Sequence, residues 1–377
     1  MAVSFHSPPR RILVRGVNWL GDAVMTTPAL LRLREKYPGA PIALLTPAKL
    51  CDLYRHHPAV DEVLGFAPGE GLFSVGRKLR AGNFDLALVL PNSPRSAMEP
   101  WLAHIPQRIG YARSWRNWFL TRAVPTRPGH VPMRKPTIRE VRRLVENPRR
   151  VTGGFQPPTT AHQLHEYLHL VAALGASPDP LAPQLAVTDA EVAAVKKKFG
   201  LENIFPPILS LNPGAEYGPA KRWPVERFIA AAREIQARTN CVWLVLGGQS
   251  DTALAAEIGA ALGSRPPAVY NLAGQTSLRE LMALLRLSRL LLTNDTGPMH
   301  VAAALGTPVV VPFGSTSPEL TGPGLPGDSR HRLLKSDVPC SPCFLRECPI
   351  DFRCLNGISS TQVAAAIMEF VPDARNA

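Results

Sequence analysis

Three short polar segments each follow an apolar run, and each gathers residue types that can do chemistry. The first is Val14–Asp22, where an apolar run ends in a glycine-containing turn and a helical pattern begins. Ligands of open parallel sheets bind at the carboxyl ends of strands, and Asp22 would stand at such a crevice. Its carboxylate could act as a general base there, or it could cap the first helix. The spacing leaves both interpretations open.

The second segment covers residues 212–224 and contains two glycines followed by the cations Lys221 and Arg222. Pro224 suits the first turn of a helix. A flexible loop with two cations can close over phosphate groups and neutralise their charge. The order Gly-x4-Gly-Lys-Ser/Thr is absent, so the segment is not a P-loop. The alternative is a solvated Lys–Arg pair in front of a helix.

The third segment, Thr293–His300, begins where a buried apolar run ends in Asn-Asp. Thr296 and Gly297 then start a helix, whose first N–H groups and positive dipole end favour an anion. His300 lies one turn further on and can reach the same anion. The second and third segments together predict a nucleoside diphosphate site.

These segments require strands and helices in alternation, and the sequence predicts two blocks of them. Continuous apolar runs are typical of parallel strands that are buried on both faces. Helical patterns between the runs indicate right-handed βαβ units and two doubly wound α/β sheets. The expected strands are residues 11–15, 42–46, 62–66 and 86–90, then 208–211, 241–246, 269–272, 290–293 and 308–313. The expected helices include 28–36, 161–174, 189–199, 225–238 and 278–287.

The two blocks predict two domains, which agrees with a length of 377 residues. The segment Gly175–Pro183 is rich in proline and small residues and is the expected linker. We therefore expect one domain over residues 1–178 and another over 184–355. A hydrophobic fraction of 45% and a charged fraction of 19% exclude a disordered or fibrous chain. Residues 1–10 lack the apolar core of a signal peptide, so we expect a cytoplasmic location.

The net charge is +13, and most of it lies in residues 108–150, which hold twelve Lys or Arg and two acidic residues. Such a local field attracts an anionic partner, such as nucleic acid, an anionic membrane or a phosphorylated substrate. The alternative is a solvated basic loop. Because the segment is rich in Pro, Gly and Trp, we expect long loops and no regular basic helix.

The motifs over residues 11–31, 212–224 and 293–309 resemble the ADP-heptose:lipopolysaccharide heptosyltransferases (glycosyltransferase family 9), and within them the heptosyltransferase II branch. The resemblance implies a GT-B fold, with two Rossmann-like doubly wound parallel-sheet domains that face a cleft. It also implies inverting transfer of L-glycero-D-manno-heptose from ADP-heptose to the inner core of lipopolysaccharide. The first domain would bind the acceptor and the second the donor. A C-terminal helix within residues 356–377 would pack back on the first domain.

The resemblance also implies roles for individual residues. Asp22 matches the catalytic base, and Lys221 matches the lysine that binds the donor diphosphate. The residues that would contact the donor ribose and phosphates are Asp295, Thr296, Gly297 and His300. Asp251 is a weaker candidate for the adenosine ribose, because the alignment there is ambiguous.

We further expect Arg113, Arg116 and Arg122 to contact the anionic lipid A-core acceptor or the membrane surface. The protein would then be a monomer, peripheral at the inner face of the inner membrane. No cofactor is expected for catalysis, because the sequence offers no Asp-x-Asp cluster for a metal. The alternatives are another GT-B transferase or epimerase, or a nucleic-acid-binding protein. The last is disfavoured because no recognition motif is present.

Four cysteines near the C-terminus have the spacing C-x2-C-x4-C-x5-C: Cys340, Cys343, Cys348 and Cys354. Such spacing in a reducing compartment predicts a structural zinc site or, less often, an iron–sulfur site. Free thiols and disulfides are the alternatives. Cys51 and Cys241 lie in apolar runs and are expected to be inert core residues.

Overall fold

A computed structural model describes residues 8–147, 155–263 and 269–371. By internal contacts the chain divides into two compact units. The first unit contains residues 1–130 and 160–186, and the second contains residues 131–159 and 187–377. The boundaries differ from the expected 1–178 and 184–355, because residues 131–159 are grouped with the second unit.

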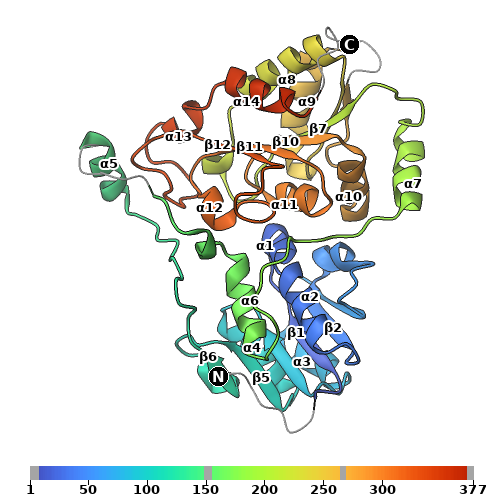
Figure 1. Ribbon diagram of the computed structural model, residues 1–377, viewed down its shortest axis with the longest axis vertical. Helices are drawn as coiled ribbons and strands as arrows, with labels where there is room; N and C mark the ends of the chain where they lie inside the picture. Colours follow the sequence, from blue (N-terminus) through green and yellow to red (C-terminus); the bar gives the residue numbers. More distant parts are fainter. Residues whose placement is uncertain (1–7, 148–154, 264–268, 372–377) are drawn as a thin grey trace. The chain divides into compact units, whose positions relative to one another are not determined.

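The first unit is a six-stranded parallel sheet with helices around it (Figure 1). The strand order is β3-β2-β1-β4-β5-β6, the doubly wound order in which the connections change direction between β1 and β4. The strands are β1 (Ile12–Arg15), β2 (Ile42–Pro47), β3 (Glu62–Phe66), β4 (Leu86–Val89), β5 (Gln107–Tyr111) and β6 (Arg122–Val124). The helices are α1 (Leu20–Met25), α2 (Thr27–Lys36), α3 (Leu72–Arg80), α4 (Pro94–Leu102) and α6 (Leu164–Ala172), with shorter 3₁₀ turns η1 (Ala48–Tyr54) and η2 (Asn117–Phe119).

The second unit repeats this order, as β12-β11-β10-β7-β8-β9, so its direction changes between β7 and β10. Its strands are β7 (Ile208–Asn212), β8 (Val242–Val245), β9 (Val269–Asn271), β10 (Leu290–Thr293), β11 (Val309–Phe313) and β12 (Arg332–Lys335). Its helices are α5 (Ile138–Glu146), α7 (Asp189–Phe199), α8 (Val225–Thr239), α9 (Thr252–Leu262), α10 (Leu278–Leu287), α11 (Gly297–Ala304), α12 (Pro318–Thr321), α13 (Arg353–Asn356) and α14 (Ser360–Met368). The short turns are η4 (Thr159–Ala161), which spans the unit boundary, η5 (Pro219–Lys221) and η6 (Gln249–Asp251).

The central strands are mostly apolar because both of their faces are covered. Every residue of β1, β4, β8 and β10 is buried. In the first unit, Val75 and Leu79 of α3 pack against Leu13 and Leu45 of the sheet. The expected α/β class, with two doubly wound parallel sheets, is confirmed. In the residues described, no helix has the length and apolar character needed to cross a membrane.

Two segments around the sheets bear on the sequence predictions. The C-terminal helix α14 belongs to the second unit, where Val363, Ala364 and Ile367 join the core formed by α8 and the sheet. The contact expected between this helix and the first domain stays a prediction. The basic stretch 108–150 is not only loops, since it holds most of β5, all of β6 and the basic helix α5, which a Thr137–Glu140 capping box starts. Residues 148–150 lie outside the described part.

Candidate functional site

Two asparagines join the loops that leave β7 and β10 in the second unit. Asn294 donates from Nδ2 to the carbonyl of Pro213 (2.6 Å) and accepts at Oδ1 from the N–H of Trp223 (2.9 Å). Asn212 donates from Nδ2 to Thr293 Oγ1 (3.2 Å). Both asparagines are buried. They fix the 213–223 loop against the end of β10, which is the switch point where doubly wound sheets bind ligands.

Lys221 and Asp295 form an ion pair at this edge, with 2.6 Å between Nζ and Oδ2. The Asp295 side chain is 4% exposed and that of Lys221 is 15% exposed. Thr316, after β11, donates its hydroxyl to the same Oδ2 atom. Asp295 therefore holds the ammonium group in place, and water screens this pair less than a surface pair. The predicted Lys221 and Asp295 are in direct contact.

Helix α11 begins directly after Asp295. Thr296 is its N-cap in an extended conformation without a side-chain capping bond, and Gly297 is its first residue. The first N–H groups of a helix have no acceptor within the helix, so those of Thr296 and Gly297 can bind an anion. His300 is buried on the same helix. The structure thus places a cation and a helix N-terminus together at the end of β10.

Asp251 lies at the same edge of the sheet, after β8. Its carboxylate accepts from the N–H of Gly248 (3.0 Å). A Cβ atom on Gly214 would approach Asp251 Oδ2 to 2.4 Å, so any other residue there would push the Asp251 carboxylate away. Gly214 therefore lets the loop after β7 lie directly against Asp251. The ends of β7, β8 and β10 therefore carry all the predicted donor-binding residues: Lys221, Asp251 and the four residues of the third segment.

In the first unit, Asp22 is a partly buried residue in the first turn of α1. The N-cap is Trp19, so the capping interpretation of Asp22 was wrong. Gln163 donates from Nε2 to Asp22 Oδ1 (3.3 Å) and to the hydroxyl of Tyr167 (2.9 Å). Burial, and next the charge of Asp22, hold the pKa of Tyr167 well above its usual value. Asp22 is therefore a held carboxylate at the carboxyl end of β1, with a neutral phenol nearby.

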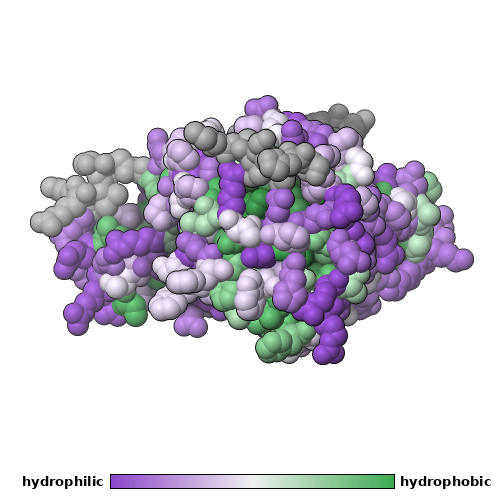
Figure 2. Space-filling model, turned by 90° about the horizontal axis from the view of Figure 1, so that it is seen from below, coloured by the Kyte–Doolittle hydropathy of each residue, from purple (hydrophilic) through white to green (hydrophobic). Residues whose placement is uncertain are grey.

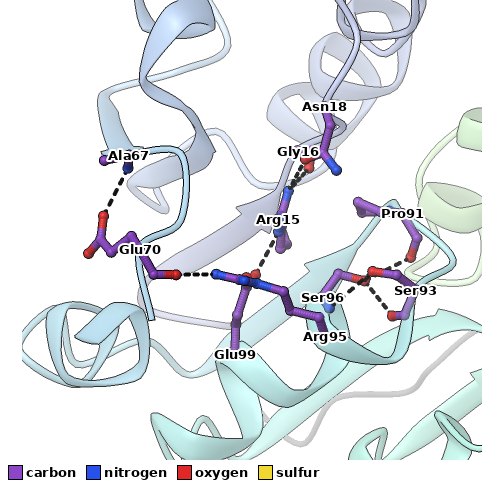
Figure 3. A network of polar contacts seen from close by, with 10 residues as sticks. All are labelled: Arg15, Gly16, Asn18, Ala67, Glu70, Pro91, Ser93, Arg95, Ser96 and Glu99. Atoms are coloured by element: carbon purple, nitrogen blue, oxygen red, sulfur yellow. Dashed lines mark hydrogen bonds and ion pairs between the residues drawn. The ribbon is translucent and has the colours of Figure 1, made fainter. Parts of the chain in front are cut away.

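The buried carboxylate of Glu99 pairs with two arginines near the turn that precedes α1 (Figure 3). Glu99 is fully buried and binds Arg15 Nε (2.7 Å) and Arg95 Nε (3.2 Å). Arg15 also donates to Asn18 Oδ1 (3.0 Å) and to the carbonyl of Gly16. Arg15 thus ties the turn before α1 to helix α4. No signal in the sequence pointed to this network, although Arg15 lies inside the first segment.

Arg116 is fully buried, so it cannot contact a membrane surface as expected. Nη1 donates to Asn92 Oδ1 (3.1 Å), whereas Nε and Nη2 have no hydrogen-bond partner in the described residues. Burial lowers the pKa of the guanidinium to about 10. Arg113 donates to Ala112 and Thr126, and Arg122 donates to Ala173. Arg113 and Arg122 are thus partly engaged within the protein.

The four clustered cysteines are free thiols in the structure. Within the described ranges, no group of three or more His, Cys, Asp or Glu side chains is placed to hold a metal ion. The expected zinc site is therefore not supported. Burial raises the pKa values of Cys340 and Cys343, and raises that of Cys354 to about 12. Cys241 is buried in the core, and Cys51 is half-buried beside Gly65, which fits an inert role.

Comparison with known proteins agrees with this arrangement. The family described as glycosyltransferase family 9 (heptosyltransferase) matches residues 72–352. The chain belongs to glycosyltransferase family 9. It is similar to lipopolysaccharide heptosyltransferase 2 of Salmonella typhimurium, with 33% identity over 83% of this chain and 85% of that protein. It is also similar to lipooligosaccharide heptosyltransferase 2 of Haemophilus influenzae, with 30% identity over 87% and 90% of the two chains.

A solved structure of an E. coli ADP-heptose lipopolysaccharide heptosyltransferase II superposes on this family 9 chain with a TM-score of 0.74. It covers 96% of this chain and 98% of that one, with 28% identity. The expected family and enzyme class are therefore confirmed, and the chain is a glycosyltransferase.

Proposed function

We propose that this family 9 glycosyltransferase transfers L-glycero-D-manno-heptose from ADP-heptose to the inner core of lipopolysaccharide, as a heptosyltransferase II. The proposal rests on one observation: Lys221 and the N-terminus of α11 lie together at the β7/β10 switch point. This arrangement suits a diphosphate. The relatives named heptosyltransferase 2 supply the identity of the sugar donor and acceptor.

In the donor site, Lys221 and the N–H groups of Thr296 and Gly297 bind the diphosphate, and His300 contacts it from the same helix. Asp295 keeps Lys221 in position. Asp251 accepts from the ribose hydroxyls beside Gly214. As the bond between the anomeric carbon and the phosphate oxygen breaks, negative charge grows on the departing ADP. Fixed cations and N–H groups stabilise that charge in the transition state.

In the acceptor site, Asp22 is the general base. An acceptor hydroxyl oxygen attacks the anomeric carbon from the face opposite the leaving ADP. The carboxylate takes the hydroxyl proton as the new bond forms. Gln163 keeps the Asp22 carboxylate oriented. The product is a glycoside of inverted configuration, with ADP released.

The acceptor is anionic, and the first unit offers it cations. Arg116 is fully buried beside Asn92 and is not part of the surface that meets the acceptor. Arg113 and Arg122 of the same unit supply positive charge that attracts the acceptor. The protein acts as a monomer on the cytoplasmic face of the inner membrane, to which it binds peripherally.

The test is direct incubation with ADP-heptose and a truncated core acceptor, with detection of the glycosylated product by mass spectrometry. We expect heptose transfer with ADP-heptose and not with UDP-glucose. Transfer from UDP-glucose alone, or epimerisation of the sugar without transfer, would contradict the proposal.

A further inference from the structure

The cysteine-rich segment between β12 and α13 contacts two loops of the candidate donor site. The hydroxyl of Tyr217 donates to the carbonyl of Phe344 (2.7 Å), and the N–H of Ala220 donates to the carbonyl of Arg346 (3.0 Å). On its other side, the N–H groups of Cys343 and Phe344 both donate to the carbonyl of Ser315 (3.0 and 2.6 Å). The segment therefore joins the loop that carries Lys221 to the loop that carries Thr316.

The contact with the first of these loops requires a glycine. Gly218 has a φ of 151°, and a Cβ atom there would lie 2.6 Å from the carbonyl oxygen of Arg346. Only glycine allows both this backbone conformation and this close approach. The loop and the cysteine-rich segment are thus packed backbone against backbone, which fixes the position from which the Arg346 side chain starts.

Three cations meet around the ring of Tyr217. Lys221 Nζ lies 4.9 Å, Arg346 Cζ 5.2 Å and Lys135 Nζ 5.8 Å from the ring centroid. Lys221 is paired with Asp295. In the part of the chain that the structure describes, Arg346 and Lys135 have no acidic partner. One aromatic ring and one carboxylate do not balance three positive charges, and an anion bound between them would relieve their repulsion.

We propose that Arg346 is a donor-binding residue that contacts the terminal phosphate of the nucleoside diphosphate, and that the cysteine-rich segment serves to position it. The proposal rests on the donor site described above. The guanidinium fork matches phosphate geometry and can bind two oxygens at once. The Tyr217 ring holds the guanidinium next to Lys221, which leaves its N–H groups to face the ligand.

The test is calorimetry of ADP and AMP binding to the full chain and to Arg346→Gln. The substitution keeps the backbone carbonyl that binds Ala220, and the side chain is exposed, so the fold should persist. We expect ADP to bind about 10-fold more weakly, the loss of one charge-assisted contact, and AMP to bind as in the wild type. Arg346→Lys should fall between the two, because it keeps the charge without the fork.

The matched control is Arg353→Gln at the start of α13, since that guanidinium is already bound to Asp351. It removes the same charge and should leave ADP affinity unchanged. Equal ADP affinity for Arg346→Gln and Arg353→Gln would overturn the proposal, as would an equal loss for ADP and AMP. Lys221→Ala separates this failure from that of the donor site. If that variant also binds ADP normally, the nucleotide site itself is wrongly placed.

Discussion

The carboxylate of Asp22 combines two properties that a general base needs at the residue scale. It is partly exposed in the first turn of α1, and one oxygen is held by Gln163. A held carboxylate loses little freedom when it takes a proton, which favours transfer in the transition state. Because Trp19 is the N-cap, capping the helix does not explain why an aspartate stands here.

We predict that Asp22→Asn keeps ADP affinity and lowers kcat by about 10²–10⁴-fold, the usual contribution of general-base catalysis. Steady-state kinetics with the lipid acceptor measure kcat, and calorimetry measures ADP affinity. Asp52→Asn is the control, since Asp52 pairs with Arg55 on the surface of the same unit. Near-normal turnover of Asp22→Asn would show that another group removes the proton.

The second prediction at this scale concerns Lys221. Lys221→Ala removes the cation and leaves the buried carboxylate of Asp295 facing the phosphates. We expect ADP affinity to fall by about 2–3 kcal/mol, a loss that a charge-assisted contact alone can supply. His300→Ala should cost less, because it removes one polar contact. Calorimetry with ADP measures both variants.

The control for this pair is Lys198→Ala, which breaks an ion pair with Glu280 on the α7 side of the second unit. It should leave ADP affinity unchanged. If Lys221→Ala and His300→Ala both bind ADP like Lys198→Ala, the nucleotide does not bind at the β7/β10 switch point.

Helix α7 packs against α10 in the second unit, and one acidic residue of α7 serves both helices. Glu191 completes the capping box of α7 with Thr188 and also binds Arg279 of α10 by two hydrogen bonds (2.8 and 2.7 Å). Hydrogen bonds from Arg279 are the main reason that the pKa of Glu191 falls to about 2. A carboxylate with a lowered pKa stabilises the fold at neutral pH and ceases to do so when it is protonated.

At the element scale we predict that Glu191→Gln lowers the free energy of unfolding by about 1 kcal/mol at pH 7, since water still reaches the Glu191 side chain, which is 23% exposed, and screens the pair in part. The folded pKa of about 2 lies below the unfolded value near 4.3, so this stability is present above pH 4.3. It is lost as pH falls toward 2. Urea denaturation at several pH values should show wild type and variant converging in acid. Glu226→Gln on the exposed start of α8 is the control, and a difference independent of pH would contradict the prediction.

The sequence predicted the parts of the fold and site that depend on local pattern. Apolar runs marked β1, β2, β4, β7 and β10, and the residues after them marked the site. It could not predict β5 and β6, because their residues Gln107–Tyr111 and Arg122–Val124 are mostly polar or short and become strands only by pairing with β4 and each other.

Other features could not be predicted because they depend on contacts between distant segments. The apolar face of α14 indicates that the helix packs on something, but only the fold identifies α8 as its neighbour. The link from Gln163 to Asp22 spans 141 residues, and no local signal announces it. Cysteine spacing likewise fixes distances along the chain and not the positions of the thiols in space, and the described residues include no group of three or more side chains placed to hold a metal ion.

The distribution of charge and aromatic residues over the whole molecule bears on membrane attachment. On the face drawn in Figure 2, hydrophobic residues form separate patches within a mostly hydrophilic surface. In the first unit, Trp115 and Trp118 are 83% and 85% exposed. In the second, α5 presents exposed Arg142 and Arg143. Tryptophan favours the membrane interface, and cations near an anionic surface each contribute about 1 kcal/mol.

We predict that the protein binds anionic vesicles reversibly and that this binding weakens at high salt, because the Debye length shrinks to about 3 Å at 1 M.

Arg116 is left unchanged in the test, since it is buried and its reversal would disturb the fold. Arg142→Glu with Arg143→Glu should reduce sedimentation with anionic vesicles, and Trp115→Ser with Trp118→Ser should reduce it at both salt concentrations. Lys196→Glu with Lys197→Glu on α7 makes the same charge change and should have a smaller effect. All of these variants should bind ADP normally, while the first two pairs should raise KM for the lipid acceptor. Equal binding to neutral vesicles, or equal loss from the α5 and α7 reversals, would mean that attachment depends on neither this helix nor its charge.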